Sequence, residues 1–182
     1  MSARLFAALE LPPEVRAGLV AFGREAAARD RALRPTREDA LHLTLAFLGH
    51  RALDEIDPAC EAVRAVAGAP APVLSLADPL WLAPRRPHVL TVGLEDPSGG
   101  LARIHAAVLE AMVREAGHEA GARAFRPHVT VARVRGQIRP FELPGPPPLE
   151  FQPPAVTLYR SRLGRGPARY EQVASVPLST LS

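Results

Sequence analysis

The hydrophobic and polar positions of this chain follow two different periods, which predicts strands interleaved with helices. Apolar residues spaced three or four positions apart predict helices at about 12–29, 54–67 and 101–116. Short apolar or alternating runs predict strands at 3–9, 41–48, 73–76, 89–94, 127–134, 156–163 and 170–176. Polar or proline-rich segments predict loops at 31–39, between 76 and 89, at 140–154 and, as a hairpin, at 164–167.

The connections between several neighbouring strands are too short for the crossover that a parallel pair needs. We therefore predict an α+β fold whose sheet is mainly antiparallel. The length of 182 residues fits one domain, or two small lobes that share a core.

One hydrophobic pattern occurs twice, as Leu-His-Leu-Thr-Leu-Ala at 41–46 and as Pro-His-Val-Thr-Val-Ala at 127–132. The two histidines are 86 positions apart, close to half the chain, and each pattern follows a predicted helix and an arginine-bearing loop. We interpret this as a single two-lobed domain over 1–182 with an internal pseudo-repeat, in which the two lobes face one another.

Side chains along a strand alternate between its faces, so each copy of the pattern has one polar and one apolar face. His42 and Thr44 share a face in the first copy, and His128 and Thr130 share a face in the second. The leucines and valines between them anchor the strands in a core. Two such strands beside each other would form a pocket with two imidazoles and two hydroxyls.

That set of groups suits the hydrolysis of a cyclic phosphodiester. An ordinary imidazole, with a pKa near 6.5, can either take a proton from attacking water or give one to a departing oxygen near neutral pH. Threonine hydroxyls can stabilise charge that develops on the non-bridging oxygens. A zinc site is disfavoured because each strand offers one nitrogen ligand and no third ligand recurs with it, so we expect no metal and no other cofactor.

The composition excludes several other chemistries. All 22 basic residues are arginines, and without lysine the chain has no P-loop, no Schiff-base amine and no lysyl-adenylate nucleophile. The net charge of +3 is compatible with an RNA partner, since arginine pairs well with phosphate.

The single cysteine, Cys60, excludes an internal disulfide and suits a reducing compartment. No apolar run approaches the ~20 residues of a membrane span, and the first residues carry no long apolar signal region. We therefore expect a cytoplasmic protein with no membrane association. A fold that closes on itself also makes a monomer the default expectation.

The paired motifs, in their contexts, closely resemble the two-histidine phosphoesterase superfamily, and most of all its RNA 2′,3′-cyclic phosphodiesterases, also called the 2′-5′ RNA ligase family. The resemblance covers nearly the whole chain, with matching segments at 4–8, 41–49, 86–90, 125–133, 158–161 and at Tyr170. It implies two pseudo-twofold-related, mainly antiparallel sheets with helices outside and the active site in the cleft between lobes.

The same resemblance implies hydrolysis of a terminal 2′,3′-cyclic phosphate to a 2′-phosphomonoester. It implies that His42 is the proton donor and His128 the proton acceptor, with Thr44 and Thr130 holding the phosphate. Nothing in the residues themselves fixes this polarity. The chain departs from the family at 33–35, where family members often carry tryptophan, and at His88 and Thr91, which replace an arginine and a tryptophan.

Further residues are candidates for binding the substrate. Aromatic residues could stack on a base or pack in the core, and arginines near the motifs or in the middle loop could contact phosphate or pair at the surface. The candidates are Phe6, Arg85, Arg86, Phe125, Arg126, Arg133 and Tyr159.

The sequence therefore predicts an enzyme that acts on RNA 3′ ends or nucleoside 2′,3′-cyclic phosphates, with weak reverse 2′-5′ ligation possible. Two alternatives stay open. One is a module that binds RNA ends without turning them over, and the other is an esterase of the same superfamily acting on another cyclic or 2′-5′ phosphodiester.

Overall fold

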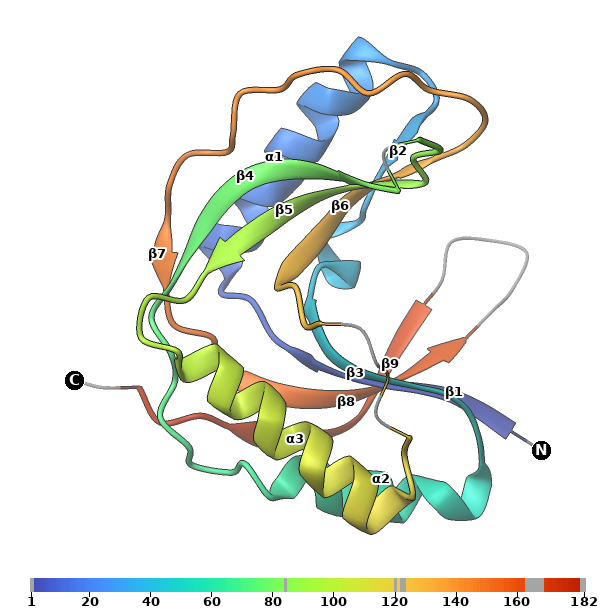
Figure 1. The fold of residues 1–182 in the computed structure, drawn as a ribbon, viewed down its shortest axis with the longest axis vertical. Coiled ribbons are helices and arrows are strands. Elements are labelled where there is room, and N and C mark those ends of the chain that lie inside the picture. The colour runs from blue at the N-terminus through green and yellow to red at the C-terminus, as the bar shows by residue number, and fades with distance from the viewer. Residues whose placement is uncertain (1, 84, 120, 122–123, 163–168, 181–182) are drawn as a thin grey trace.

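A computed structural model describes residues 2–83, 85–119, 121, 124–162 and 169–180, and the hairpin loop predicted at 164–167 lies outside these residues. Three α-helices, two short 3-10 helices (η) and nine strands alternate along the described chain (Figure 1). In chain order they are β1 (Ser2–Leu9), α1 (Pro13–Arg29), β2 (Leu33–Pro35), η1 (Glu38–Ala40), β3 (Leu43–Ala52), η2 (Leu53–Glu55), α2 (Ile56–Arg64), β4 (Leu74–Leu82), β5 (Val89–Glu95), α3 (Gly100–Ala116), β6 (His128–Val134), β7 (Glu150–Phe151), β8 (Ala155–Arg162) and β9 (Arg169–Pro177).

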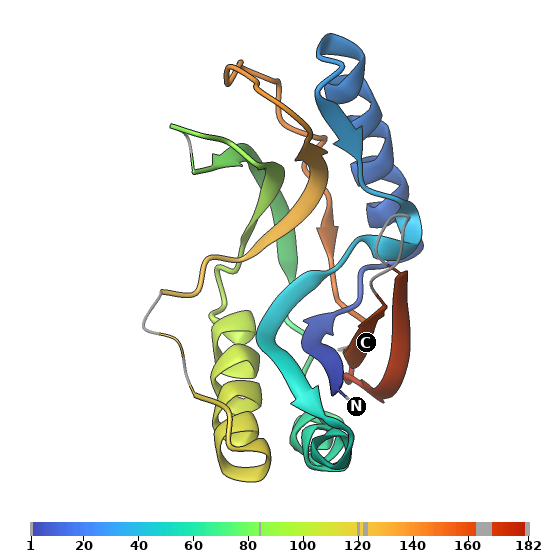
Figure 2. The same ribbon diagram turned by 90° about the vertical axis from the view of Figure 1, so that its right-hand side faces the viewer.

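The strands form one curled antiparallel sheet, which confirms the predicted α+β class. Its order is β7-β4-β5-β6-β3-β1-β8-β9, and β2 pairs with β6 beside this path. The two predicted sheets are therefore two halves of one sheet, joined where Leu43 of β3 pairs with Val129 of β6. Figure 2 shows how the two halves curl away from this junction.

Each half of the sheet is covered by a helix that follows a strand of the other half. Helix α1 follows β1 in the chain but packs against β2 and β6, whereas α3 follows β5 and packs against β3. Helix α2 packs beside α3 and against β8 and β9. This reciprocal packing adds to the proposal of a single two-lobed domain with an internal repeat.

The apolar faces of the two repeated patterns lie in the core as predicted. Leu43, Leu45, Val129 and Val131 are each at most 5% exposed. Burial of such side chains supplies most of the stabilisation that anchors these strands. In the described part of the chain, no helix combines the length and the apolarity that crossing a bilayer would require.

Some predicted boundaries are wrong. Strand β4 continues to Leu82, so Trp81 lies on a strand rather than in a loop, and β2 and η1 occupy the segment predicted as a loop at 31–39. The strand predicted at 73–76 is too short because a proline such as Pro79 is typical of a loop. Pro79 lies at a register shift in the pairing with β5, and the pairing with β7 covers only Leu74 and Ser75. At such a position the sheet tolerates a residue without a backbone N–H. Strand β3 continues to Ala52, and α2 ends at Arg64 instead of residue 67.

A β-bulge follows the threonine of each repeated pattern. On β6, Thr130 pairs with Thr91 and Ala132 pairs with Leu90, so Val131 is an extra residue. On β3, Thr44 pairs with Ala8 and Ala46 pairs with Ala7, so Leu45 is likewise extra. A bulge shifts the alternation of side chains by one position. The residue three positions after each threonine, Phe47 or Arg133, therefore returns to the face of the histidine.

The β6 bulge rests on Gly23 of α1. A Cβ atom at Gly23 would lie 2.7 Å from the Val131 carbonyl oxygen, which accepts a hydrogen bond from the backbone N–H of Thr36 at 2.8 Å. The contact is with the backbone, so it cannot be relieved by a change of side-chain rotamer.

We predict that Gly23→Ala lowers the free energy of unfolding by about 1–3 kcal/mol, because the added methyl group overpacks the α1–β6 contact. Gly18→Ala on the same helix is the matched control. Its Cβ would meet only the Leu149 side chain, at 3.5 Å, and alanine favours helix by up to about 1 kcal/mol. Urea unfolding of both variants measures the difference, and equal stabilities would contradict the proposed packing.

Candidate active site

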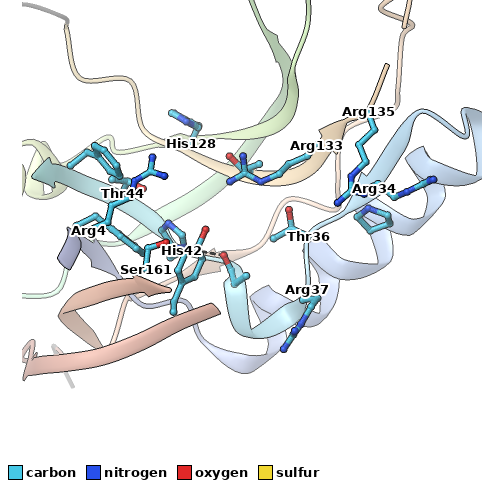
Figure 3. Close-up of a pocket in the computed structure, with 16 residues that line it drawn as sticks. Arg4, Arg34, Thr36, Arg37, His42, Thr44, His128, Arg133, Arg135 and Ser161 are labelled. Carbon is cyan, nitrogen blue, oxygen red and sulfur yellow. Dashed lines mark hydrogen bonds between the residues drawn. The ribbon is translucent and has the colours of Figure 1, made fainter. Parts of the chain in front are cut away.

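A cleft of about 650 Å³ is lined by residues from both halves of the sheet, and it contains both histidines and both threonines of the repeated pattern (Figure 3). The strand junction explains this convergence. Because Leu43 pairs with Val129 in antiparallel register, the residues on either side of that pair are opposed: His42 with Thr130, and Thr44 with His128. The core pair points one way, and these four polar side chains point the other.

Both histidines are oriented by the same local hydrogen bond. His42 Nδ1 lies 2.9 Å from the carbonyl oxygen of Ala40, and His128 Nδ1 lies 2.7 Å from the carbonyl oxygen of Arg126. A carbonyl can only accept, so Nδ1 carries the hydrogen in each ring. The Nε2 atom of each neutral ring is then the one available to exchange a proton with a ligand.

The surroundings of His42 favour its neutral form. Its ring packs against Phe6, with centroids 4.7 Å apart, and meets Tyr170 edge-on at 5.2 Å. Burial lowers the pKa of His42 to about 4; the hydrogen bond to Ala40 opposes this effect, and the charges of Arg133 and His128 add to it. At neutral pH the free protein therefore holds His42 uncharged.

The lining of the cleft is strongly basic. It includes five arginines, and among the described lining residues there is no aspartate or glutamate. Such a concentration of fixed positive charge favours an anionic ligand. The arginines are Arg4, Arg34, Arg37, Arg133 and Arg135.

Two of the candidates for substrate binding line this cleft, and a third lies just behind it. Phe6 and Arg133 are lining residues. Tyr159 stacks on Phe6 at 5.3 Å, its ring centroid lies 6.2 Å from that of His42, and its hydroxyl lies 3.5 Å from a Glu10 carboxylate oxygen. Tyr159 therefore supports Phe6 rather than facing the cleft.

The remaining candidates lie outside the lining of the histidine cleft. Phe125 and Arg126 border a separate hollow of about 610 Å³, and Phe125 stacks on His105 with centroids 3.8 Å apart. Arg126 still serves the site through its carbonyl, which holds His128. Arg85 and Arg86 lie in the β4–β5 connection, and their contact with substrate stays a prediction.

Several lining residues were not among the sequence candidates. Arg4 alternates with Phe6 along β1, so the period of two could have found it. Phe47 could not have been found that way, because it reaches the cleft only through the bulge at Leu45. It is 48% exposed, and the Arg4 guanidinium lies 4.7 Å above its ring. The other lining residues of this kind are Arg34, Pro35, Thr36, Arg37, Ala40, Arg135, Ser161 and Tyr170.

Within the described residues, no group of three or more histidine, cysteine or acidic side chains is placed to hold a metal ion. The side chains that line the described cleft offer chemistry of their own. Two imidazoles can move protons, two hydroxyls can donate hydrogen bonds, and arginines can hold an anion.

Fold and site together define a curled antiparallel sheet whose central strands present paired histidines in a basic cleft. Residues 12–165 match the family model of the 2′-5′ RNA ligase superfamily, and the chain belongs to this superfamily.

Two curated relatives share the RNA 2′,3′-cyclic phosphodiesterase name. The protein from Escherichia coli is 32% identical, with 92% of each chain covered. The protein from Geobacillus stearothermophilus is 31% identical over 95% of this chain, which spans 56% of that relative's length.

Solved structures agree with this assignment. Escherichia coli LigT in complex with 3′-AMP superposes with a TM-score of 0.79 at 29% identity, covering 98% of this chain and 99% of LigT. TT0787 of Thermus thermophilus gives a TM-score of 0.79 at 26% identity, covering 96% of this chain and 97% of TT0787.

We predict that His42 in the free protein stays neutral down to about pH 4, and this couples to stability. Unfolded histidine binds a proton near pH 6.5, so the contribution of His42 lowers the free energy of unfolding by roughly 3 kcal/mol as pH falls from 6.5 to 4. His42→Gln removes this dependence. Denaturant unfolding at several pH values measures the difference between the two proteins, and parallel profiles would contradict the lowered pKa.

Proposed function

We propose that this protein hydrolyses RNA-terminal 2′,3′-cyclic phosphates to 2′-phosphomonoesters by histidine acid–base catalysis that needs no metal ion. The observation that carries the proposal is the matched pair of imidazoles, each held at Nδ1 by the carbonyl two residues before it, in one arginine-lined cleft. The names of the curated relatives support the same substrate.

The reaction needs one proton removed and one proton supplied. In our proposal His128 Nε2 takes the proton of a water molecule as the water oxygen attacks phosphorus. The bond between phosphorus and the ribose 3′ oxygen breaks, and His42 Nε2 gives that oxygen its proton. The phosphate stays on the 2′ oxygen, and each histidine returns to its starting state by exchange with solvent.

Exposure supports this division of roles. The hydrogen bond that orients His128 lies at the exposed surface, whereas that of His42 is partly buried among aromatic rings. Solvent water therefore reaches His128 more readily, as a base that activates water requires. His42, with a pKa of about 4 when the cleft is empty, gains its proton when the anionic phosphate binds beside it and favours the charged imidazole.

The threonines complete the phosphate site. Thr44 and Thr130 lie across the strand junction from the histidines and line the cleft. Their hydroxyls can donate to the two non-bridging oxygens, whose charge grows as water attacks. Each threonine then acts beside the histidine contributed by the other half.

The same geometry allows a weak ligation. If the 5′ hydroxyl of a second RNA replaces water, His128 takes its proton as its oxygen attacks phosphorus, the bond from phosphorus to the 3′ oxygen breaks, and the 3′ oxygen takes the proton from His42. The product is a 2′-5′ phosphodiester. Water at its full concentration competes with the hydroxyl, so hydrolysis dominates.

The proposed partners are RNA 3′ ends or nucleoside 2′,3′-cyclic phosphates, acted on by a monomer in the cytoplasm. The free, buried thiol of Cys60 suits a reducing compartment.

We predict that wild-type protein hydrolyses adenosine 2′,3′-cyclic phosphate in EDTA and yields the 2′-phosphate by phosphorus NMR. His42→Ala and His128→Ala should each lower kcat by about 10²–10⁴-fold, because each removes one proton transfer. His50→Ala is the control, since His50 is an exposed histidine of β3 that does not line the cleft.

Other results would redirect the proposal. Binding of the 2′-phosphate product without any turnover by wild-type protein would indicate a module that only binds RNA ends. Hydrolysis of a different cyclic or 2′-5′ phosphodiester in place of this one would indicate a sister esterase. Activity that disappears in EDTA and returns with a divalent metal would contradict metal-independent catalysis.

A further inference from the structure

The cleft extends well beyond the histidines, toward the end of β6 and the short strand β2. Figure 3 shows Arg34 and Arg135 on this side, and Arg4 and Ser161 on the other. From Thr130 to Arg135 the chain covers roughly 16 Å, at ~3.3 Å per strand residue. We call this part of the cleft, lined by Arg34, Thr36, Arg133 and Arg135, the β2–β6 arm. A single phosphate held by the threonines cannot also reach the far end of this arm, so the cleft has room and charge for a second anion.

The arrangement of charges in this arm costs stability. Arg34 of β2 pairs directly with Arg133 of β6 in antiparallel register, and like charges in that position repel. Arg135 follows two residues later, next to the end of the strand. Ion pairs nearby use other arginines instead, joining Arg16 to Glu38 and Arg37 to Asp39. The Arg34 guanidinium donates only to the backbone carbonyls of Arg31 and Leu33 among the described residues. Arginines that line the cleft without a carboxylate among its described lining residues are what an anionic ligand would stabilise.

The backbone is shaped to present these arginines. The bulge at Val131 returns Arg133 to the face that carries His128 and Thr130. The backbone N–H of Arg135 donates to the carbonyl of Ala32 at 2.7 Å, which holds Arg135 beside β2. Without the bulge, strand alternation would send Arg133 to the core face.

A hydroxyl in the same arm lacks a partner. Thr36 Oγ1 is buried and has no hydrogen-bond partner among the described residues, and Thr36 lines the cleft between the histidines and Arg34. A buried hydroxyl that is left unsatisfied costs free energy, which a ligand oxygen at this position would recover.

We propose that Arg34, Arg133 and Arg135 form a second phosphate site, which binds the phosphate on the 5′ oxygen of the nucleoside whose cyclic phosphate reacts. This inference rests on the proposed function and deepens it. The substrate then lies with its cyclic phosphate between the histidines and its 5′ phosphate in the β2–β6 arm. In an RNA chain that 5′ phosphate is the last phosphodiester, so the site favours RNA ends over free cyclic nucleotides.

A chemical double-mutant cycle tests the site. One axis compares the dinucleotide ApA 2′,3′-cyclic phosphate with the same molecule whose internal linkage is an uncharged methylphosphonate. The other axis compares wild-type protein with Arg34→Gln/Arg135→Gln. We expect the charged linkage to raise kcat/KM about tenfold or more in wild type, as charge-assisted contacts do, and to have little effect in the variant.

A matched control separates a local contact from general charge. Arg24→Gln/Arg103→Gln removes the same net charge from exposed positions on α1 and α3, and it should keep the wild-type preference for the charged linkage. Thermal unfolding of each variant checks that it is folded. A preference that survives Arg34→Gln/Arg135→Gln in full, or that falls equally in the control, would overturn the site.

Two further substrates complete the test. Adenosine 2′,3′-cyclic phosphate with a 5′ monophosphate shows whether a terminal phosphate gains the same advantage as a phosphodiester. Adenosine 2′,3′-cyclic phosphate with a free 5′ hydroxyl tests the cyclic phosphodiesterase activity separately from the second phosphate site. No hydrolysis of any substrate would refute the proposed function, whereas equal kcat/KM for all of them would refute only the second phosphate site.

Discussion

The site depends on one contact between strands: the pairing of Leu43 with Val129, both fully buried. This contact joins the two halves of the sheet, and it lies between His42 and Thr44 on one strand and between His128 and Thr130 on the other. Burial of the two apolar side chains therefore fixes four polar side chains on the opposite face. The same few residues stabilise the core and align the polar side chains in the cleft. A shift of one residue in the β3–β6 register would therefore lose both the apolar packing and the alignment.

Electrostatics then determine which ligands the cleft attracts and the protonation state of His42 in the free protein. Arginines surround a histidine that burial keeps neutral, so the free protein has fixed positive charge in the cleft but no charge on His42. An anionic phosphate is the counterion that such a cleft favours, and in the proposed mechanism its binding raises the proton affinity of His42. In the proposed mechanism, substrate binding and protonation of His42 are therefore coupled, so His42 becomes charged only when substrate is bound.

The period of strands explains why so much of the site could be predicted. His42, Thr44, His128 and Thr130 follow simple alternation, and their buried neighbours confirm it. The bulges explain much of what was missed, since an extra residue on a strand leaves no mark in the pattern and reverses the faces beyond it. Phe47 became a lining residue in this way. Short β2 was hidden because three residues carry no periodicity, and proline signals obscured the length of β4.

The most direct test of acid–base catalysis by two opposed histidines replaces the leaving oxygen with sulfur. In a nucleoside 2′,3′-cyclic phosphorothiolate with sulfur at the 3′ position, the departing thiolate needs no proton, so an enzyme without its acid should recover. The account predicts that His42→Ala regains most of its kcat on this substrate, whereas His128→Ala stays impaired. The reverse pattern would exchange the two roles, and equal impairment of both variants on both substrates would contradict paired acid–base catalysis.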